Sequence, residues 1–297
     1  MQTNVSDKPS TPDIAPPSDN DIELLAQGKH YNPHSILGAH TVEGGTAIRA
    51  LKPNAESVVA RIGDADYPLT HVAHGVFSGV VPFEDLMDYR LAVTWPGGHT
   101  AVSADGYRFL PTLGELDLHL FGEGRHERLW DILGAHEQNY TTLDGDVSGV
   151  SFAVWAPAAS GVTVIGDFDG WTGRSFPMRA LGSTGVWELF IPDLAPGAVY
   201  KYRVHGSDGV ARDKADPMAF ATEIPPATAS VVSSSSFEWT DDGWLDARAA
   251  VEPTAAPMSV YEIHLASWRQ NLGYRELAEQ LADYILETGR ASCRERV

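Results

Sequence analysis

Residues Phe152–Val204 read FAVWAPAASGVTVIGDFDGWTGRSFPMRALGSTGVWELFIPDLAPGAVYKYRV. Apolar residues recur with a period of two in several short runs, as in Phe152 and Val154 or in Val162 and Val164. That period is typical of half-buried β-strands, and the Gly, Pro and Asp residues between the runs are typical of turns. The stretch therefore predicts an antiparallel β-sandwich.

Two motifs stand out within this stretch. GDFDGW (Gly166–Trp171) lies on a turn between two runs, and YKYRV (Tyr200–Val204) is a later run. Together with FAVWAP before them and VWELFIP between them, they resemble the family-48 carbohydrate-binding module, the β-sandwich attached to glycogen- and starch-handling enzymes. The resemblance covers residues 139–236. The ordered set of motifs is specific, whereas any one of them alone would be weak.

Composition excludes several function classes. The chain has 297 residues, with 21 Lys and Arg against 40 Asp and Glu, and hence a formal net charge of −19. Such a charge disfavours binding to nucleic acid or to an anionic membrane, whereas a neutral polymer such as an α-glucan is indifferent to it. No apolar run approaches the roughly 20 residues of a membrane span. The single cysteine, Cys293, excludes an intrachain disulfide, and we expect a cytoplasmic protein.

The sandwich pattern occurs twice. A weaker copy of the pattern lies N-terminal to the stretch described above. In it, AIRALKP (Ala47–Pro53) matches FAVWAP, YRLAV (Tyr89–Val93) matches YKYRV, and DGYRF (Asp105–Phe109) matches DPMAF (Asp216–Phe220). This is an internal duplication. It predicts a first β-sandwich at residues 21–117 that lacks the tryptophan-bearing turn.

Other segments flank the two copies. Residues 1–20 are rich in Pro, Ser, Asp and Thr, and they predict a disordered lead. The stretch YNPHSILGAH (Tyr31–His40) resembles the N-terminal domain of glycogen branching enzymes. Residues 118–138 predict a linker with a short helix that wedges the two sandwiches together. Residues 237–257 predict a second linker, pinned by Trp239 and Trp244.

The C-terminal part changes character. MSVYEIHLASW (Met258–Trp268) predicts a strand buried on both faces, and YRELAEQLADYILETG (Tyr274–Gly289) predicts a helix that Gly289 ends. Such a unit begins a (β/α)8 barrel. Its sequence resembles the first strand and helix of the catalytic barrel of the alpha-amylase superfamily, in the form found in branching enzymes. Residues 290–297 break the pattern and resemble a translated sequencing adapter, so we interpret them as a non-native tail, Cys293 included. The predicted fold is mainly β: two tandem immunoglobulin-like β-sandwiches followed by the first β/α unit of a truncated barrel.

Two residues are candidates for glycan binding. A flat aromatic ring can lie against the C–H face of a glucose ring, and polar groups can reach its hydroxyls. Trp171 is the candidate platform, and Lys201 on a neighbouring strand is the candidate hydrogen-bond donor. The alternative for Trp171 is a packing role. The loop HGSDGVARDKADP (His205–Pro217) carries no second aromatic residue, although better glycan binders of the family have one there.

Other aromatic and histidine residues are expected to have structural roles. Trp155, Trp187, Tyr200 and Tyr202 lie in strand patterns with apolar partners, so we expect them to pack in the core. His30, His34 and His40 lie on a loop without cysteines or a supporting acidic pattern, so we predict packing and hydrogen bonding and no metal site.

The resemblances imply a function. A complete glycogen (1,4-alpha-glucan) branching enzyme cleaves an α-1,4 linkage and transfers the released segment to a 6-hydroxyl by a retaining mechanism. The family's catalytic carboxylates lie on later barrel strands, so no catalytic residue is assigned to this chain, which we expect to be inactive by itself. No cofactor is implied, and we expect a monomeric full-length form. The alternatives are a stand-alone glycan-binding or regulatory module and a debranching or trehalohydrolase-type enzyme.

Overall fold

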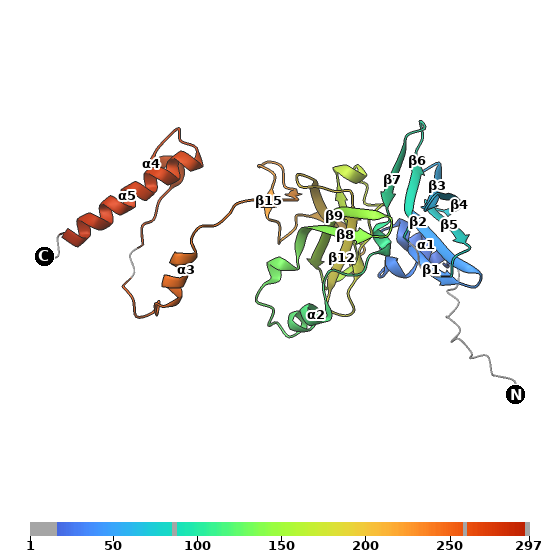
Figure 1. Cartoon of the computed structure of the whole chain (residues 1–297), viewed down its shortest axis with the longest axis horizontal. Helices are drawn as coiled ribbons and strands as arrows, with labels where there is room; N and C mark the ends of the chain where they lie inside the picture. Colours follow the sequence, from blue (N-terminus) through green and yellow to red (C-terminus); the bar gives the residue numbers. More distant parts are fainter. Residues whose placement is uncertain (1–16, 85–87, 258–259, 295–297) are drawn as a thin grey trace. The chain divides into compact units, whose positions relative to one another are not determined.

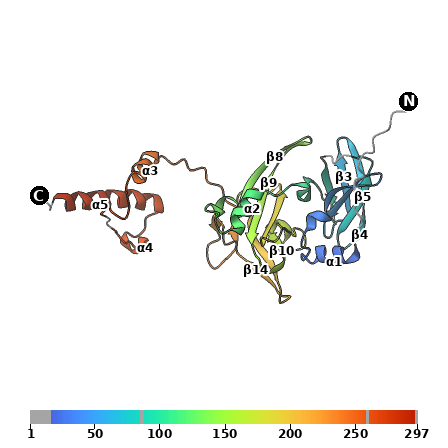
Figure 2. The ribbon, with the colours of Figure 1, turned by 90° about the horizontal axis from the view of Figure 1, so that it is seen from below.

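A computed structural model describes residues 17–84, 88–257 and 260–294 (Figures 1 and 2). The chain is mainly β, and its contacts divide it into two units, with the boundary between Ser236 and Phe237. The first unit contains both copies of the duplicated pattern. Most of the predicted lead lies outside the described residues, but its last residues are ordered as a helix start, because Ser18 caps helix α1 (Asp19–Ala26) in a capping box with Asp21.

The first copy forms one antiparallel sheet that folds over on itself, in the order β1-β2-β5-β4-β3-β6-β7. Strand β4 makes the fold possible, because Ala65–Leu69 pair with β3 whereas Thr70–Ala73 pair with β5. Side chains from β2 and β5 then share one core with side chains from β3 and β6. The elements are α1, η1 (Pro33–Ser35), β1 (Gly38–Val42), β2 (Gly45–Leu51), β3 (Ser57–Ile62), β4 (Ala65–Ala73), β5 (Val76–Val81), β6 (Arg90–Thr94), β7 (Thr100–Ala104) and η2 (Gly106–Arg108).

The second copy is the predicted antiparallel sandwich. One sheet has the order β11-β12-β9-β8, and the other has the order β10-β13-β16-β15 with β14 paired to β13. Its core holds Phe152, Trp187 and Tyr200 among other buried side chains. The elements are β8 (Gly134–Thr142), β9 (Gly145–Trp155), β10 (Ala159–Gly166), η4 (Asp167–Asp169), β11 (Arg179–Ala180), β12 (Val186–Pro192), β13 (Val199–Gly206), β14 (Ala211–Lys214), β15 (Ala221–Thr222) and β16 (Ser230–Val231).

The duplication extends to individual hydrogen bonds. The sequence ILGAH opens the first strand of each copy, and the last residue of each bonds back to its own turn: His40 Nε2 lies 3.0 Å from the Leu37 carbonyl oxygen and His136 Nε2 lies 2.9 Å from that of Leu133. Each copy also contains a buried aspartate that accepts a 2.6 Å bond from a tyrosine hydroxyl, from Tyr89 to Asp105 and from Tyr200 to Asp216.

The segment predicted to wedge the sandwiches together does not do so. Helix α2 (Glu115–Gly122) and η3 (Leu129–Asp131) instead cover the second sandwich, where Leu118 and Phe121 pack against Ala153 and Val186. Ala153 of β9 and Val186 of β12 face away from the core of the sandwich. The apolar side chains of α2 remove this apolar surface from water.

Contacts between the two copies involve η2, strand β6 and loops of the first copy. The Tyr107 hydroxyl donates to the Pro177 carbonyl at 3.1 Å, and the Phe109 ring contacts that of Phe190 with centroids 4.7 Å apart. The loop after α1 also reaches across, because the Tyr31 carbonyl accepts from the Ala180 amide at 2.9 Å. These bonds pair backbone groups that would otherwise be unsatisfied at the junction.

The second unit contains α3 (Asp242–Ala249), α4 (Leu265–Trp268) and α5 (Tyr274–Arg294). The predicted helix is present, but Gly289 does not end it, since a glycine within a helix costs only about 1 kcal/mol and no proline follows. The predicted strand Met258–Trp268 is wrong in its described part, where Val260–His264 are irregular and α4 follows. A strand exists only when paired, and no partner strand lies in the described part of this unit. Trp239 and Trp244 are exposed and do not pin the segment.

Candidate functional site

The predicted platform residue sits on a rigid turn between β10 and β11. Element η4 is followed by Gly170 at φ 60°, and Trp171 itself has φ 60°. The left-handed region costs a residue other than glycine of the order of 1 kcal/mol or more, and such strain persists only where the surroundings impose it. The Trp171 backbone amide donates to Asp169 Oδ1 at 2.9 Å, and its indole Nε1 donates to Asp167 Oδ1 at 2.7 Å. The half-buried indole is therefore held in one orientation.

Asp169 organises the whole turn. Besides Trp171, its carboxylate accepts the amides of Gly166 at 3.0 Å and Gly173 at 2.9 Å, and the Thr172 hydroxyl at 3.2 Å. Four donors on one carboxylate use nearly all of its acceptor capacity. The turn is thus preorganised by its own side chains.

Lys201 lies on β13, directly opposite Ile165 of β10. Its ammonium donates to the Thr228 hydroxyl at 2.8 Å. Trp171 bonds to Gly166 through its backbone, and Gly166 is paired with Tyr200, so the register brings Trp171 and Lys201 to the same end of two adjacent strands. Within the part of the chain that the structure describes, no hydrogen bond or ring contact joins the two side chains directly.

Arg203 is a further member of this cluster that the sequence reasoning missed. It donates from Nη1 to the Thr172 carbonyl at 2.6 Å and from Nη2 to the Trp171 carbonyl at 3.4 Å. Its Nε and Nη2 also donate to the Asp213 carboxylate at 2.7 and 2.9 Å. These hydrogen bonds raise the pKa of Arg203 and lower that of Asp213. The alternation of YKYRV places Arg203 on the same face as Lys201, so the period-two pattern alone could have indicated it.

Three of the four packing predictions for aromatic residues were right and one was wrong. Trp187 is 1% exposed, and Tyr200 and Tyr202 are fully enclosed around Asp216. Trp155 is 55% exposed, because it is the last residue of β9 and faces outward beside the ring of Phe121. The period of two assigns Trp155 to one face of the strand, but it does not show whether other residues cover that face at the end of β9.

The three loop histidines have separate environments. His30 lies 3.6 Å from Asp21, the His34 ring contacts the Tyr107 ring at 5.0 Å, and His40 bonds to its own turn. Burial lowers the pKa of His34 to about 3, so that it is neutral at physiological pH. The residues that the structure describes contain no group of three or more His, Cys, Asp or Glu side chains that could hold a metal ion.

The two sandwiches match two family models. One is the alpha-1,4-glucan branching enzyme GlgB, N-terminal domain, at residues 18–107, and the other is carbohydrate-binding module 48 (isoamylase N-terminal domain), at residues 132–219. A curated relative from Rhodococcus jostii (strain RHA1), 1,4-alpha-glucan branching enzyme GlgB, is 68% identical over 273 residues. The chain is homologous to the N-terminal part of GlgB branching enzymes.

The matches cover the chain much more fully than they cover its relatives. The alignment with the Rhodococcus jostii enzyme takes in 92% of this chain and 37% of that protein. GlgB of Nocardia farcinica (strain IFM 10152) is 63% identical over 91% of this chain and 36% of its own length. A solved structure of pullulanase from Anoxybacillus sp. LM18-11 complexed with maltotetraose is 18% identical, with a TM-score of 0.28 over 76% of this chain and 28% of that one. None of the described helices is both long and apolar enough to cross a membrane.

Proposed function

We propose that this chain is the N-terminal portion of a 1,4-alpha-glucan branching enzyme, which forms α-1,6 branches in glycogen by cleaving and transferring α-1,4-glucan segments. The observation that carries the proposal is the 68% identity to a GlgB enzyme over nearly the whole chain. In a retaining mechanism, one carboxylate forms a covalent glycosyl-enzyme and a second acts as acid and then base. We assign neither role to a residue of this chain, and we place the protein in the cytoplasm as a monomer.

The part of this function that the chain itself performs is α-glucan binding by the second sandwich. Trp171 supplies a flat ring in a fixed orientation, and the ammonium of Lys201 and the hydroxyl of Thr228 lie at the same end of the sheet. A glucose ring stacked on the indole would present its hydroxyls to these polar groups. Arg203 holds the carbonyls of the platform turn, so it acts as a positioning residue for Trp171.

The binding proposal is tested by titrating the full 297-residue chain with maltoheptaose in a calorimeter. We expect Trp171→Ala to weaken binding by at least about tenfold, which corresponds to about 1.4 kcal/mol. Trp155→Ala is the matched control, since it removes an exposed tryptophan outside the cluster and should leave the affinity unchanged. Equal affinity of Trp171→Ala and the wild-type chain would refute the platform.

The catalytic half of the proposal has its own assay. Incubation of the chain with amylose, followed by iodine staining and debranching, should reveal no new α-1,6 branches. A longer polypeptide that continues this reading frame through a complete barrel should form them. Branch formation by the 297-residue chain alone would overturn the assignment of catalysis to residues beyond it.

A further inference from the structure

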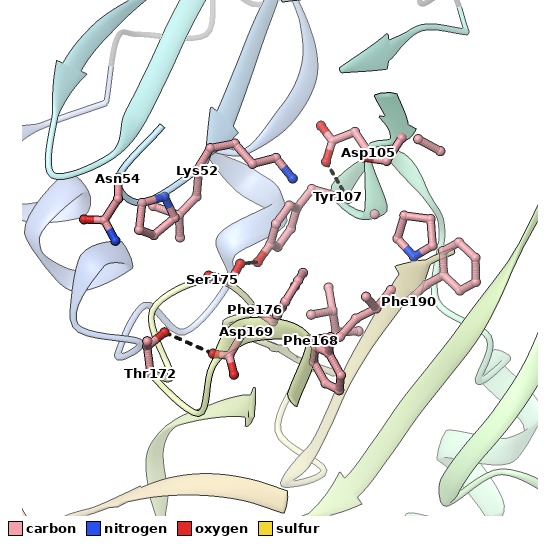
Figure 3. Close-up of a pocket in the computed structure, with 18 of the residues that line it drawn as sticks. Lys52, Asn54, Asp105, Tyr107, Phe168, Asp169, Thr172, Ser175, Phe176 and Phe190 are labelled. Carbon is pink, nitrogen blue, oxygen red and sulfur yellow. Dashed lines mark hydrogen bonds between the residues drawn. The ribbon is translucent and has the colours of Figure 1, made fainter. Parts of the chain in front are cut away.

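A cleft of about 410 Å³ lies between the two sandwiches, and Trp171 is not among the residues that line it. Its lining comes from Trp95 and from four segments: Leu51–Asn54 at the end of β2, Ser103–Tyr107 at the end of β7, the turn from Phe168 to Phe176, and Leu189–Pro192 of β12 (Figure 3). Its volume falls in the range typical of small-molecule sites. The cleft is therefore large enough to bind a ligand, and both copies of the duplicated fold contribute to it.

An unpaired cation points into this cleft. Lys52 is half-buried, and Figure 3 shows its ammonium directed toward Tyr107 and Asp105. Among the residues that the structure describes, its Nζ has no hydrogen-bond or ion-pair partner. Burial lowers the pKa of Lys52, while the nearby carboxylates of Asp105 and Asp193 act in the opposite direction. Because the ammonium faces the cleft and has no acceptor from the described residues, a ligand in the cleft can supply one.

The other charges in the cleft limit what that ligand can be. Asp105 is 2% exposed, and its carboxylate accepts the Tyr89 hydroxyl at 2.6 Å and the Tyr107 amide at 3.1 Å. Asp169 adds a second negative charge to the lining. One ammonium against two carboxylates repels phosphates and other anions, whereas a neutral molecule with hydroxyl groups can accept from Lys52 and donate to a carboxylate.

The remaining wall is aromatic. Phe168 and Phe176 pack edge to face with ring centroids 5.6 Å apart, and both line the cleft on the side of the second sandwich. Trp95 lines it from the first sandwich. Aromatic surface on the walls and a few hydrogen-bonding groups between them are the chemistry that suits a sugar ring, which has apolar C–H faces and a polar rim.

We propose that this cleft is a second α-glucan site, which takes glucosyl units between Lys52 and the Phe168–Phe176 turn. The same turn carries Trp171, so one loop would contact the glucan on both of its sides. The identity of the ligand as an α-glucan rests on the proposed function, whereas its being a neutral, hydroxyl-rich molecule rests on the cleft alone.

The experiment is an NMR titration of the isotope-labelled 297-residue chain with maltotriose. The backbone amides of Gly106 and Tyr107 report on the cleft, and the indole N–H of Trp171 reports on the platform. We expect both sets of signals to shift. Lys52→Met should weaken the titration seen at Gly106 and Tyr107 by at least about tenfold and leave the Trp171 titration unchanged.

Controls separate this proposal from the proposed function. Lys214→Met removes an exposed lysine on β14 and should leave both titrations unchanged. Asn54→Gly is a milder cleft variant if Lys52→Met fails to fold, because glycine keeps the left-handed backbone of Asn54 at φ 62°. A shift of Trp171 alone overturns the cleft and supports the platform. A shift of the Gly106 and Tyr107 signals alone supports the cleft and overturns the platform. If neither set of signals shifts, both proposals are overturned. Inorganic phosphate should shift neither amide, and binding of phosphate in the cleft would refute a neutral ligand.

Discussion

Replacing Arg179 with methionine should destabilise the second sandwich severely. Arg179 of β11 and Glu188 of β12 are directly paired across the sheet and almost completely buried, with exposed fractions of 7% and 0%. The guanidinium donates to Glu188 Oε2 from Nε at 2.8 Å and from Nη2 at 2.6 Å, and from Nη1 to the Phe109 carbonyl at 3.0 Å. Arg179→Met would leave the carboxylate of Glu188 buried with only weak bonds of 3.4 Å from Thr112.

The expected loss is about 3–5 kcal/mol of unfolding free energy, the usual cost of removing one partner from a buried ion pair. For a unit of this size, that corresponds to a fall in melting temperature of roughly 6–20 °C. The double variant Arg179→Met/Glu188→Leu should recover most of the loss, because it leaves no charge buried. Arg61→Met is the matched control, since its pair with Asp66 is exposed and its removal should not change the melting temperature.

The destabilisation caused by Arg179→Met should also depend on pH, because Glu188 is a buried carboxyl group. Burial raises the pKa of Glu188, while Arg179 acts to lower it, so removal of Arg179 raises that pKa further. A carboxyl group whose folded pKa exceeds its unfolded value begins to destabilise the fold once the pH rises above the unfolded pKa, and the penalty grows until the pH passes the folded pKa. The penalty of Arg179→Met should therefore be greatest near pH 8 and shrink as the pH falls toward the unfolded pKa of 4.5.

Urea unfolding followed by circular dichroism at pH 8, 7, 6 and 5 measures this effect. The reasoning would be refuted by a penalty that does not change with pH, by a loss no larger than that of Arg61→Met, or by a double variant as unstable as the single one.

Three further predictions concern the duplicated fold. Gly38→Ala and Gly134→Ala should each lower the free energy of unfolding by at least about 1–2 kcal/mol, since both glycines have positive φ and a Cβ would lie 2.9 Å from a carbonyl oxygen. Gly122→Ala should not change it, because a Cβ there meets no atom within 4 Å. Thermal melts compare the three variants, and equal stability would contradict this prediction. Because burial lowers the pKa of His34 to about 3, the free energy of unfolding should decrease as the pH falls from 6.5 to 3, by at most about 1.4 kcal/mol per pH unit. His34→Phe should lose this pH dependence in urea unfolding. An unchanged pH dependence would exclude His34 as its source. Tyr200→Phe removes a bond to a buried carboxylate and should cost about 1.5–3 kcal/mol by chemical unfolding, and a neutral result would show that the neighbouring tyrosine replaces it.

Several features of this protein follow from the sequence alone. The period of two and the turn residues predicted the strands of both copies, and the repeated motifs predicted the duplication. The aligned motifs contain the tyrosine and aspartate that bond in each copy, but only the structure showed the bond. The motif GDFDGW placed Trp171 on a turn between two strands, and the structure then showed that the aspartates of this motif hold the turn. Such features depend on neighbours in the chain or on the pleat of one strand, so local patterns contain them.

The tertiary structure alone decided which faces are covered and which residues meet. Trp155 and Trp187 follow the same alternation, yet one is exposed and the other enclosed, because burial depends on what packs against a face and not on the face itself. The apolar run after Met258 lacks a paired strand for the same reason, since a strand needs a partner that its own sequence does not encode. The contact of Arg203 with the Trp171 turn, and the cleft between Lys52 and Phe168, join residues more than 30 and more than 100 positions apart. The pairing of β10 with β13 brings Arg203 to the turn, and the packing of one sandwich against the other forms the cleft.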